Sequence, residues 1–205
     1  RNSKTTERMK RIAIQGEHGC FHDIAAHAYF SGEQVQITCC ATFEEVFEQV
    51  ENDPTVIALL AIENTIAGSL LHNYDLLRKS GTTVVGEQRL HIRHCICCLP
   101  DDDWTTVVEV HSHPVALMQC RSFLDSHSGI KAVEAADTAG AAAYITQNQC
   151  HGRAAICSAE AARLYGMKIL EDSIEDNKHN FTRFLVACRP QRADFLRPLS
   201  EADKA

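Results

Sequence analysis

The chain has 205 residues, 45% of them apolar, so it is long enough to bury a sizeable core and too apolar to be disordered. Its longest uninterrupted apolar run, residues 56–62, is far shorter than the ~20 residues of a membrane-spanning helix. The 20 basic and 27 acidic side chains give a net charge of −7, which disfavours nucleic-acid binding and favours a small-molecule ligand. We therefore expect no membrane and no nucleic-acid partner.

The first eleven residues are polar and lack the apolar segment of a signal peptide, which predicts a cytoplasmic protein. Met9 and the two basic residues after it resemble a natural start. Residues 1–8 are therefore expected to be a remnant added ahead of the natural chain, and residues 190–205 to form a C-terminal tail.

Strands and helices are predicted to alternate along the chain. A glycine turn at residues 16–19 separates the first strand from the first helix. The clearest helix follows Thr42, because Thr42 and Glu45 form a capping box ahead of apolar residues at helical spacing. The predicted strands are residues 11–15, 35–40, 56–62, 106–110, 131–134 and 153–157; helices are expected at 24–30 and 70–77 and after residues 113, 137 and 158.

This alternation predicts α/β layers with mostly parallel sheets. The strands are too many for one compact sheet, and residues 81–86 look like a crossing point between two sheets. We therefore predict two lobes, one formed by residues 11–88 together with 181–189 and the other by residues 92–178. Two such lobes would leave a cleft beyond the carboxyl ends of the strands, where ligands of open α/β sheets bind.

Small polar residues stand at those carboxyl ends, just before predicted helices, in residues 63–69, 112–114, 137–139 and at Ser158. Backbone N–H groups at helix starts attract anions, so several of them around one cleft would suit a carboxylate ligand. For each residue by itself, helix capping is the alternative.

Ten cysteines would suggest disulfides in a small secreted protein, but several lie inside apolar runs, where a free thiol packs as a small hydrophobe. One spacing is compatible with a zinc site, because Cys95 and Cys98 form a C-x2-C pair that precedes His111 and His113. These histidines are only two residues apart, whereas zinc-finger histidines are three to five apart. We expect no metal and keep a zinc site at these four residues as an alternative.

Four short blocks follow one another in a characteristic order. They are I-Q-G-x-x-G at residues 14–19, E-N-T-x-x-G-S at 63–69, S-H-P-x-x-x-x-Q-C at 112–120 and N-F-T-R-F at 180–184. Together they resemble the blocks of the prephenate dehydratase family, over about residues 11–189. For the fold, we expect a two-lobed α/β architecture of the type II periplasmic-binding-protein kind, with an interlobe cleft.

The resemblance implies a lyase that converts prephenate to phenylpyruvate, water and CO2 in phenylalanine biosynthesis. Loss of CO2 and hydroxide makes the substrate ring aromatic, so the protein need only hold the ring and place a donor on the departing hydroxyl. No cofactor is implied, and a homodimer or higher homo-oligomer is expected. An arogenate dehydratase and a non-catalytic small-molecule-binding module of the same fold are the alternatives.

The resemblance also assigns residues. The threonine of its T-R-F sequence becomes Thr182, the central catalytic residue, which we interpret as a hydrogen-bond donor or proton relay. Asn64 and Gln119 are the other catalytic residues, because a neutral amide can donate to a carboxylate. Expected substrate contacts are Glu63, Thr65, Gly68, Ser69, Ser112, His113, Thr138, Asn180, Phe181 and Arg183. Strand alternation turns Arg183 away from Thr182, so it either reaches the cleft through an irregular strand or forms a structural ion pair.

Two departures from the family pattern stand out. Many members carry a serine where this chain has Phe21 and His22, which leaves the role of His22 open. The family usually adds a C-terminal ACT domain that binds phenylalanine. Only 16 residues follow Arg189, too few for a domain of at least ~50 residues, so that domain is expected to be absent or trimmed.

Overall fold

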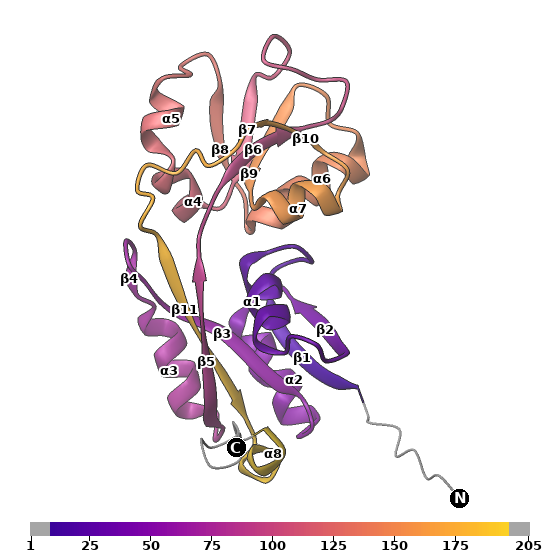
Figure 1. The fold of residues 1–205 in the computed structure, drawn as a ribbon, viewed down its shortest axis with the longest axis vertical. Helices are drawn as coiled ribbons and strands as arrows, with labels where there is room; N and C mark the ends of the chain where they lie inside the picture. Colours follow the sequence, from indigo (N-terminus) through magenta and orange to yellow (C-terminus); the bar gives the residue numbers. More distant parts are fainter. Residues whose placement is uncertain (1–8, 197–205) are drawn as a thin grey trace, which may run out of the picture.

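The computed structural model describes the backbone of residues 9–196 and the side chains of residues 9–193. The predicted remnant at residues 1–8 and residues 197–205 of the predicted tail lie outside this part. The described chain folds into two lobes, each built on one β-sheet with helices packed against it (Figure 1). The predicted two-lobed α/β fold is confirmed.

The first lobe contains a six-stranded sheet with the order β2-β1-β3-β11-β5, in which β4 pairs with β3. Its strands are β1 (Lys10–Gln15), β2 (Val35–Cys40), β3 (Ile57–Asn64), β4 (Gly68–Ser69), β5 (Thr83–His91) and β11 (Phe181–Cys188). Its helices are α1 (Phe21–Tyr29), α2 (Phe43–Asn52), α3 (Leu71–Lys79) and α8 (Pro190–Leu196).

The second lobe contains a five-stranded sheet with the order β10-β6-β9-β7-β8. Its strands are β6 (Cys95–Cys98), β7 (Glu109–Ser112), β8 (Lys131–Glu134), β9 (Arg153–Cys157) and β10 (Lys168–Glu171). Its helices are α4 (Pro114–Gln119), α5 (Arg121–Asp125), α6 (Thr138–Asn148) and α7 (Ala159–Leu164).

Local sequence explains the best-predicted helix, α2. The hydroxyl of Thr42 accepts a hydrogen bond from the backbone N–H of Glu45 at 3.2 Å, and the Glu45 carboxylate accepts from the N–H of Ala41 at 2.9 Å. Val46 and Val50, four residues apart, are buried against the sheet. The predicted helix start at Thr42 is therefore confirmed, with the reciprocal bond from Glu45 reaching Ala41, one residue before the cap.

Three sequence expectations need correction. Both sheets are mixed, because β11 and β5 in one lobe and β6 and β10 in the other pair antiparallel with their neighbours. Residues 81–86 are not the crossing point: Gly86 lies inside β5, where a Cβ would collide with the ring of Tyr29. The strand predicted at 106–110 is β7, which begins at Glu109, because Asp102 and Asp103 hold Thr106 in a turn.

The chain crosses between the lobes twice, at residues 92–94 and 172–180. A backbone hydrogen bond of 2.7 Å from Ile92 N to Asn180 O ties the two crossings together. The largest cluster of buried apolar residues also includes both lobes, from Ile12 and Ile14 in β1 to Cys95 and Ala142 in the second lobe. The lobes are therefore packed against one another as well as connected.

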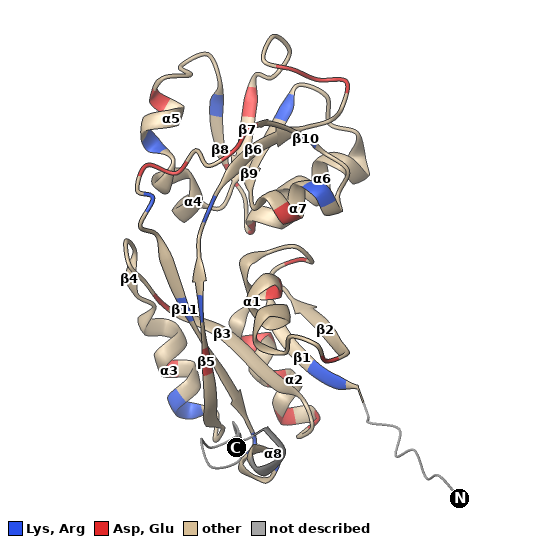
Figure 2. Cartoon of the chain, viewed as in Figure 1, with Lys and Arg blue, Asp and Glu red and all other residues tan. Residues whose placement is uncertain are grey.

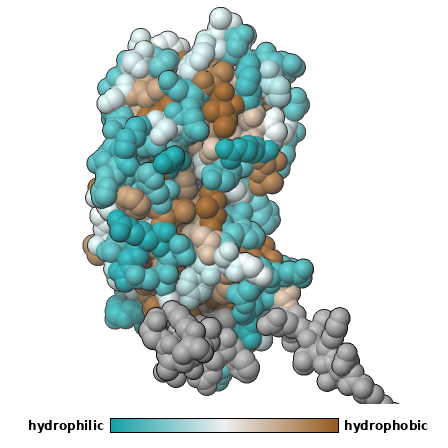
Figure 3. Space-filling view, viewed as in Figure 1, coloured by the Kyte–Doolittle hydropathy of each residue, from teal (hydrophilic) through white to brown (hydrophobic). Residues whose placement is uncertain are grey.

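The surface fits the charge analysis. Figure 2 shows basic and acidic residues spread over both lobes, with no basic stripe on the described elements. On the face shown in Figure 3, apolar side chains are visible at the level where the lobes meet. Among the described residues, no helix combines the length and apolar character needed to span a bilayer.

Candidate active site

A cavity of about 230 Å³ lies between the lobes and takes its walls from both. The first lobe contributes Phe43 from α2, Asn64 from the end of β3 and Thr182 from β11. The second lobe contributes Gln119 from the end of α4 and Thr138 from the start of α6. The three residues predicted to be catalytic thus lie on one cavity, although they are far apart in sequence.

An irregularity in β3 positions Asn64. β11 pairs Thr182 with Asn64 and Phe184 with Ala61, so two residues of β3, Ile62 and Glu63, lie opposite one residue of β11. Side chains of a regular strand alternate, so residues three apart would face opposite sides. The extra residue of this β-bulge turns both Ala61 and Asn64 toward the cavity.

The Asn64 amide connects the end of β3 to β11. Its carbonyl oxygen accepts from the backbone N–H groups of Ile66 and Ala67, both at 2.9 Å. Its NH₂ group lies 2.9 Å from Thr182 Oγ1 and 2.8 Å from Asn180 Oδ1, and donates to both. Because backbone N–H groups can only donate, the Asn64 carbonyl must face the turn and its NH₂ must face the threonine.

This orientation assigns the Thr182 proton. The threonine oxygen accepts from Asn64, and its own hydrogen has no acceptor among the hydrogen bonds of the described residues. Thr182 is 8% exposed and lines the cavity. Its hydroxyl proton is therefore available to a ligand in the cavity.

Gln119 extends the chain of hydrogen bonds into the second lobe. Its side-chain nitrogen lies 3.4 Å from Asn64 Oδ1, and its carbonyl oxygen lies 2.8 Å from Nε2 of His94. Both side chains are buried, with exposed fractions of 6% for Gln119 and 2% for His94. His94 is not among the predicted site residues, because it lies in the crossing between β5 and β6, outside the four sequence blocks.

Of the ten predicted substrate contacts, two line this cavity. His113 lines it, and its Nδ1 accepts from Val115 N at the start of α4; Thr138 lines it as the first residue of α6. Ser112 is buried and donates to Ile156 O at 2.6 Å in the second lobe. Gly68 and Ser69 are exposed in β4.

The N-F-T-R-F segment and its partner turn hold each other in place. Thr65 Oγ1 accepts from Phe181 N at 2.9 Å and donates to His179 O at 3.2 Å. Phe181 stacks on His91 with ring centroids 4.7 Å apart, and Asn180 contacts Asn64 as described. These residues support the cavity wall at the crossing.

Arg183 forms ion pairs in a neighbouring hollow of about 470 Å³, which Asn64 and Thr182 also line. Its guanidinium lies 2.6 Å from a carboxylate oxygen of Glu87 and 3.2 Å from one of Glu63. None of these three residues lines the cavity that contains Gln119. Arg183 thus forms ion pairs and, next to the irregular stretch of β3, also lines a hollow with Thr182, so both alternatives for it stay open.

His22 packs in the cavity wall between Phe43 and Phe184, with ring centroids 5.4 and 5.2 Å away. Its Nε2 accepts from Ala61 N at 3.0 Å, so the ring is neutral at that nitrogen. Burial lowers the pKa of His22 to about 4. The ring therefore stays uncharged at neutral pH and supports β3 beside the bulge.

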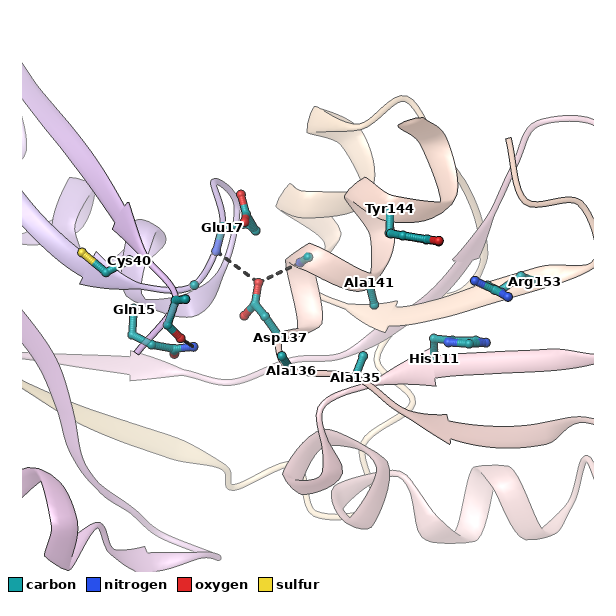
Figure 4. Close-up of a pocket in the computed structure, with 13 residues that line it drawn as sticks. Gln15, Glu17, Cys40, His111, Ala135, Ala136, Asp137, Ala141, Tyr144 and Arg153 are labelled. Atoms are coloured by element: carbon teal, nitrogen blue, oxygen red, sulfur yellow. Dashed lines mark hydrogen bonds between the residues drawn. The ribbon is translucent and has the colours of Figure 1, made fainter. Parts of the chain in front are cut away.

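A second hollow of about 440 Å³ lies at the junction, beside the first (Figure 4). At its centre the carboxylate of Asp137 accepts from the backbone N–H groups of Glu17 at 3.1 Å and Gly140 at 2.7 Å. Burial raises the pKa of Asp137. Asp137 thus caps α6 and at the same time ties the second lobe to the turn after β1.

Two more hydrogen bonds join that turn to the second lobe. Ser158 Oγ donates to Gly19 O at 3.0 Å, and the Tyr165 hydroxyl donates to His18 O at 2.5 Å. Gly19 has φ +87°, and a Cβ there would approach Ala161 Cα to 3.0 Å. Only glycine fits this close contact between the lobes.

The residues of the alternative zinc site do not come together. Cys98 Sγ points to Asp102 O, His111 to Glu109, and His113 to the start of α4. A different group converges instead, since the sulfurs of Cys95, Cys97 and Cys157 lie within 4.8 Å of one another in the buried core of the second lobe. These thiols pack among apolar residues of the largest core cluster.

The fold and the site define a two-lobed α/β protein with a cavity between its lobes. The model of the prephenate dehydratase family matches residues 12–192, and the chain belongs to that family.

Curated relatives share this region of the chain. It is 40% identical to arogenate dehydratase 5, chloroplastic, of Arabidopsis thaliana, over 87% of this chain and 42% of that protein. It is 34% identical to the bifunctional chorismate mutase/prephenate dehydratase of Escherichia coli K12, over 91% of this chain and 49% of that protein. The chain thus spans less than half the length of these relatives.

Solved structures agree with the fold. A prephenate dehydratase of Staphylococcus aureus superposes with a TM-score of 0.73 at 27% identity, over 89% of this chain and 67% of that one. GqqA, described as a novel type of quorum quenching acylase, superposes with a TM-score of 0.76 at 33% identity, over 93% of this chain and 65% of that one.

Proposed function

We propose that this chain catalyses the decarboxylating dehydration of prephenate to phenylpyruvate, water and CO2. The observation that supports it best is the hydroxyl proton of Thr182, which faces an interlobe cavity with no acceptor among the described residues. A donor is what the departing hydroxyl of prephenate needs.

In the proposed reaction the bond between the ring and its carboxylate breaks, and its electron pair enters the ring. The carbon–oxygen bond at the opposite ring position breaks in the same process, and the leaving oxygen receives a hydrogen bond or proton from Thr182. Solvent supplies the proton that is consumed overall, and the ring becomes aromatic. Asn64 holds Thr182 in the donor orientation, so the transition state is stabilised without reorganisation of the site.

Neutral donors would hold the two carboxylates. No Lys or Arg is among the described residues that line the cavity with Gln119, which offers hydroxyls and amides but also the Asp137 carboxylate. Arg89 and Arg183 line the adjoining hollow that shares Asn64 and Thr182. Thr138 is placed at the start of the eleven-residue helix α6, where backbone N–H groups and the helix dipole favour an anion. Gln119 offers an amide from α4 of the same lobe.

Arogenate is the nearest alternative substrate, and the names of the relatives include both activities. The test is to incubate the purified chain with each compound and to quantify phenylpyruvate and phenylalanine. We expect phenylpyruvate from prephenate, with a higher kcat/KM than for arogenate. A folded protein that binds prephenate and turns over neither compound would instead be a binding module.

An acylase activity is a second candidate, because the similarity to GqqA extends over most of the chain. Amide hydrolysis by Thr182 would require a base that accepts its proton. The hydrogen-bond partner of Thr182 within the described residues is the NH₂ of Asn64, which is a donor. We therefore favour the dehydratase, and N-acyl amides in the same assay would reveal the other activity.

The prediction of a cytoplasmic homodimer or higher oligomer is part of the proposal. Light scattering of the purified chain would measure its oligomeric state.

A further inference from the structure

His94 lies in the first crossing, between β5 and β6, and its ring forms part of the cavity wall. The ring is 2% exposed and meets Phe21 edge-on, with centroids 5.4 Å apart. It makes no contact with Thr182 in the hydrogen-bond network, but its Nε2 lies 2.8 Å from Gln119 Oε1. The buried imidazole of His94 therefore has one hydrogen-bond partner, the side chain of Gln119.

The direction of every bond in the chain can be worked out from the backbone. Asn64 Oδ1 accepts from two backbone N–H groups, so it is a carbonyl oxygen, and the Gln119 atom that faces it must be NH₂. The other Gln119 atom is then the carbonyl oxygen, which can only accept. His94 Nε2 must therefore carry the hydrogen.

The second nitrogen of the ring is consistent with this tautomer. His94 Nδ1 is buried and has no hydrogen-bond partner among the described residues. Burial lowers the pKa of His94, which favours the neutral ring with a single N–H. The one hydrogen of that ring is then committed to Gln119.

We infer that His94 is a positioning residue, whose Nε2–H holds the Gln119 amide in the orientation that lets its NH₂ donate to Asn64, the residue that contacts the Thr182 hydroxyl. This inference rests on the proposed dehydratase function for its kinetic consequence. The hydrogen bond itself does not depend on that function.

Removing the His94 N–H should disturb the hydrogen bonds of the Gln119 amide. Without the His94 N–H, the buried Gln119 carbonyl has no donor, and rotating the amide would bring two carbonyl oxygens face to face at Asn64. Both the unpaired carbonyl and the rotated amide weaken the hydrogen bond from Gln119 to Asn64. Asn64 is the residue that holds the Thr182 hydroxyl. The loss should therefore affect the chemical step more than substrate affinity.

The test compares His94→Leu with His94→Gln. Leucine removes the donor, and we expect kcat to fall 10- to 100-fold with KM changed less than threefold. Glutamine can place an NH₂ near the position of Nε2, and we expect it to restore kcat to within about fivefold of the parent. His127→Leu removes a histidine of the second lobe outside the cavity and should leave both constants unchanged.

A double-mutant cycle separates positioning from simple loss of stability. In a Gln119→Met background, His94→Leu should cost less than twofold more, because the group it orients is gone. If the two substitutions multiply their effects, or if His94→Gln is as impaired as His94→Leu, the inference is wrong. Thermal unfolding of each variant identifies any that fail to fold.

NMR tests the hydrogen bond without activity. With ¹⁵N-labelled histidine, His94 should show the Nε2–H tautomer in the parent, and its N–H signal should shift in Gln119→Met. An Nδ1–H tautomer would overturn the inference even if the protein dehydrates prephenate. Absence of turnover together with the expected tautomer would instead reject the proposed function and leave the His94–Gln119 bond established.

Discussion

At the scale of single residues, the cavity is organised by the direction of its hydrogen bonds. Every side chain from His94 to Thr182 is uncharged, and each donates to the next. The direction originates in the backbone N–H groups of residues 66 and 67, which cannot be reversed. Local geometry in the turn after β3 thus leaves the hydroxyl proton of Thr182, far away in sequence, free to donate to a ligand.

Replacing the Thr182 hydroxyl should abolish most of the proposed turnover. Thr182→Val keeps the branched shape but removes the donor, and we expect kcat for prephenate to fall roughly 10²- to 10⁴-fold, the usual contribution of a positioned proton donor. Thr182→Ser retains the hydroxyl and should keep much more activity. Steady-state kinetics with both variants measures this, and a fully active valine variant would contradict the assignment.

His22 should make stability depend on pH in the acid range. Its folded pKa of about 4 lies below its usual value near 6.5, so the unfolded chain binds the proton first. The contribution of His22 to the free energy of unfolding is therefore complete above pH 6.5 and decreases as the pH falls toward 4.

His22→Gln offers the matched comparison, because glutamine can still accept from Ala61 N but does not titrate. Urea unfolding between pH 7 and 4 should give a shallower loss of stability for this variant than for the parent. Equal slopes would show that His22 does not titrate in this window.

At the scale of elements, the sequence predicted those features that depend on residues close to one another in the chain. The capping box and apolar spacing of α2 identified that helix, and the polar ends of β3 and β7 pointed toward the junction. The bulge in β3 and the role of His94 could not be predicted in this way. Both depend on partners far along the chain, β11 for the bulge and Gln119 for the histidine, and leave no local pattern.

Gly19, in the turn after β1, lies where the two lobes pack closely against one another. Gly19 and Gly32 both have positive φ, +87° and +81°, but only at Gly19 would a Cβ meet other atoms. Alanine should cost about 1–2 kcal/mol of backbone strain at either position. Gly19→Ala should lose additional stability and raise KM several-fold, because it pushes α7 away from the first lobe.

Denaturant unfolding and KM of the Gly19→Ala and Gly32→Ala proteins provide the measurement. If the two variants behave alike, the contact between Gly19 and Ala161 does not hold the lobes together.

At the scale of the whole molecule, the candidate cavity depends on both lobes being close together. Thr182 and Asn64 belong to the first sheet and Gln119 to the second lobe. Asp137, Ser158 and Tyr165 hold the lobes at the turn of residues 16–19, beside that cavity. The affinity for a ligand should therefore depend on residues between the lobes that do not contact the ligand.

Tyr165→Phe should reveal this coupling, because it deletes only the hydroxyl that donates to His18 O. We expect KM for the substrate to rise about two- to tenfold with a small change in kcat. Tyr144→Phe is the matched control, since the Tyr144 hydroxyl makes no hydrogen bond within the described residues. Small-angle scattering should show a larger radius of gyration for Tyr165→Phe, and identical kinetics for both variants would argue against the coupling.

The bulge in β3 also has a consequence for chain length. Ile62 and Glu63 together occupy the space opposite Arg183, so a one-residue deletion there leaves Ala61 and Asn64 on their present side of the sheet. Related enzymes can therefore differ by one residue at this point of the strand and still present the same asparagine to the same threonine.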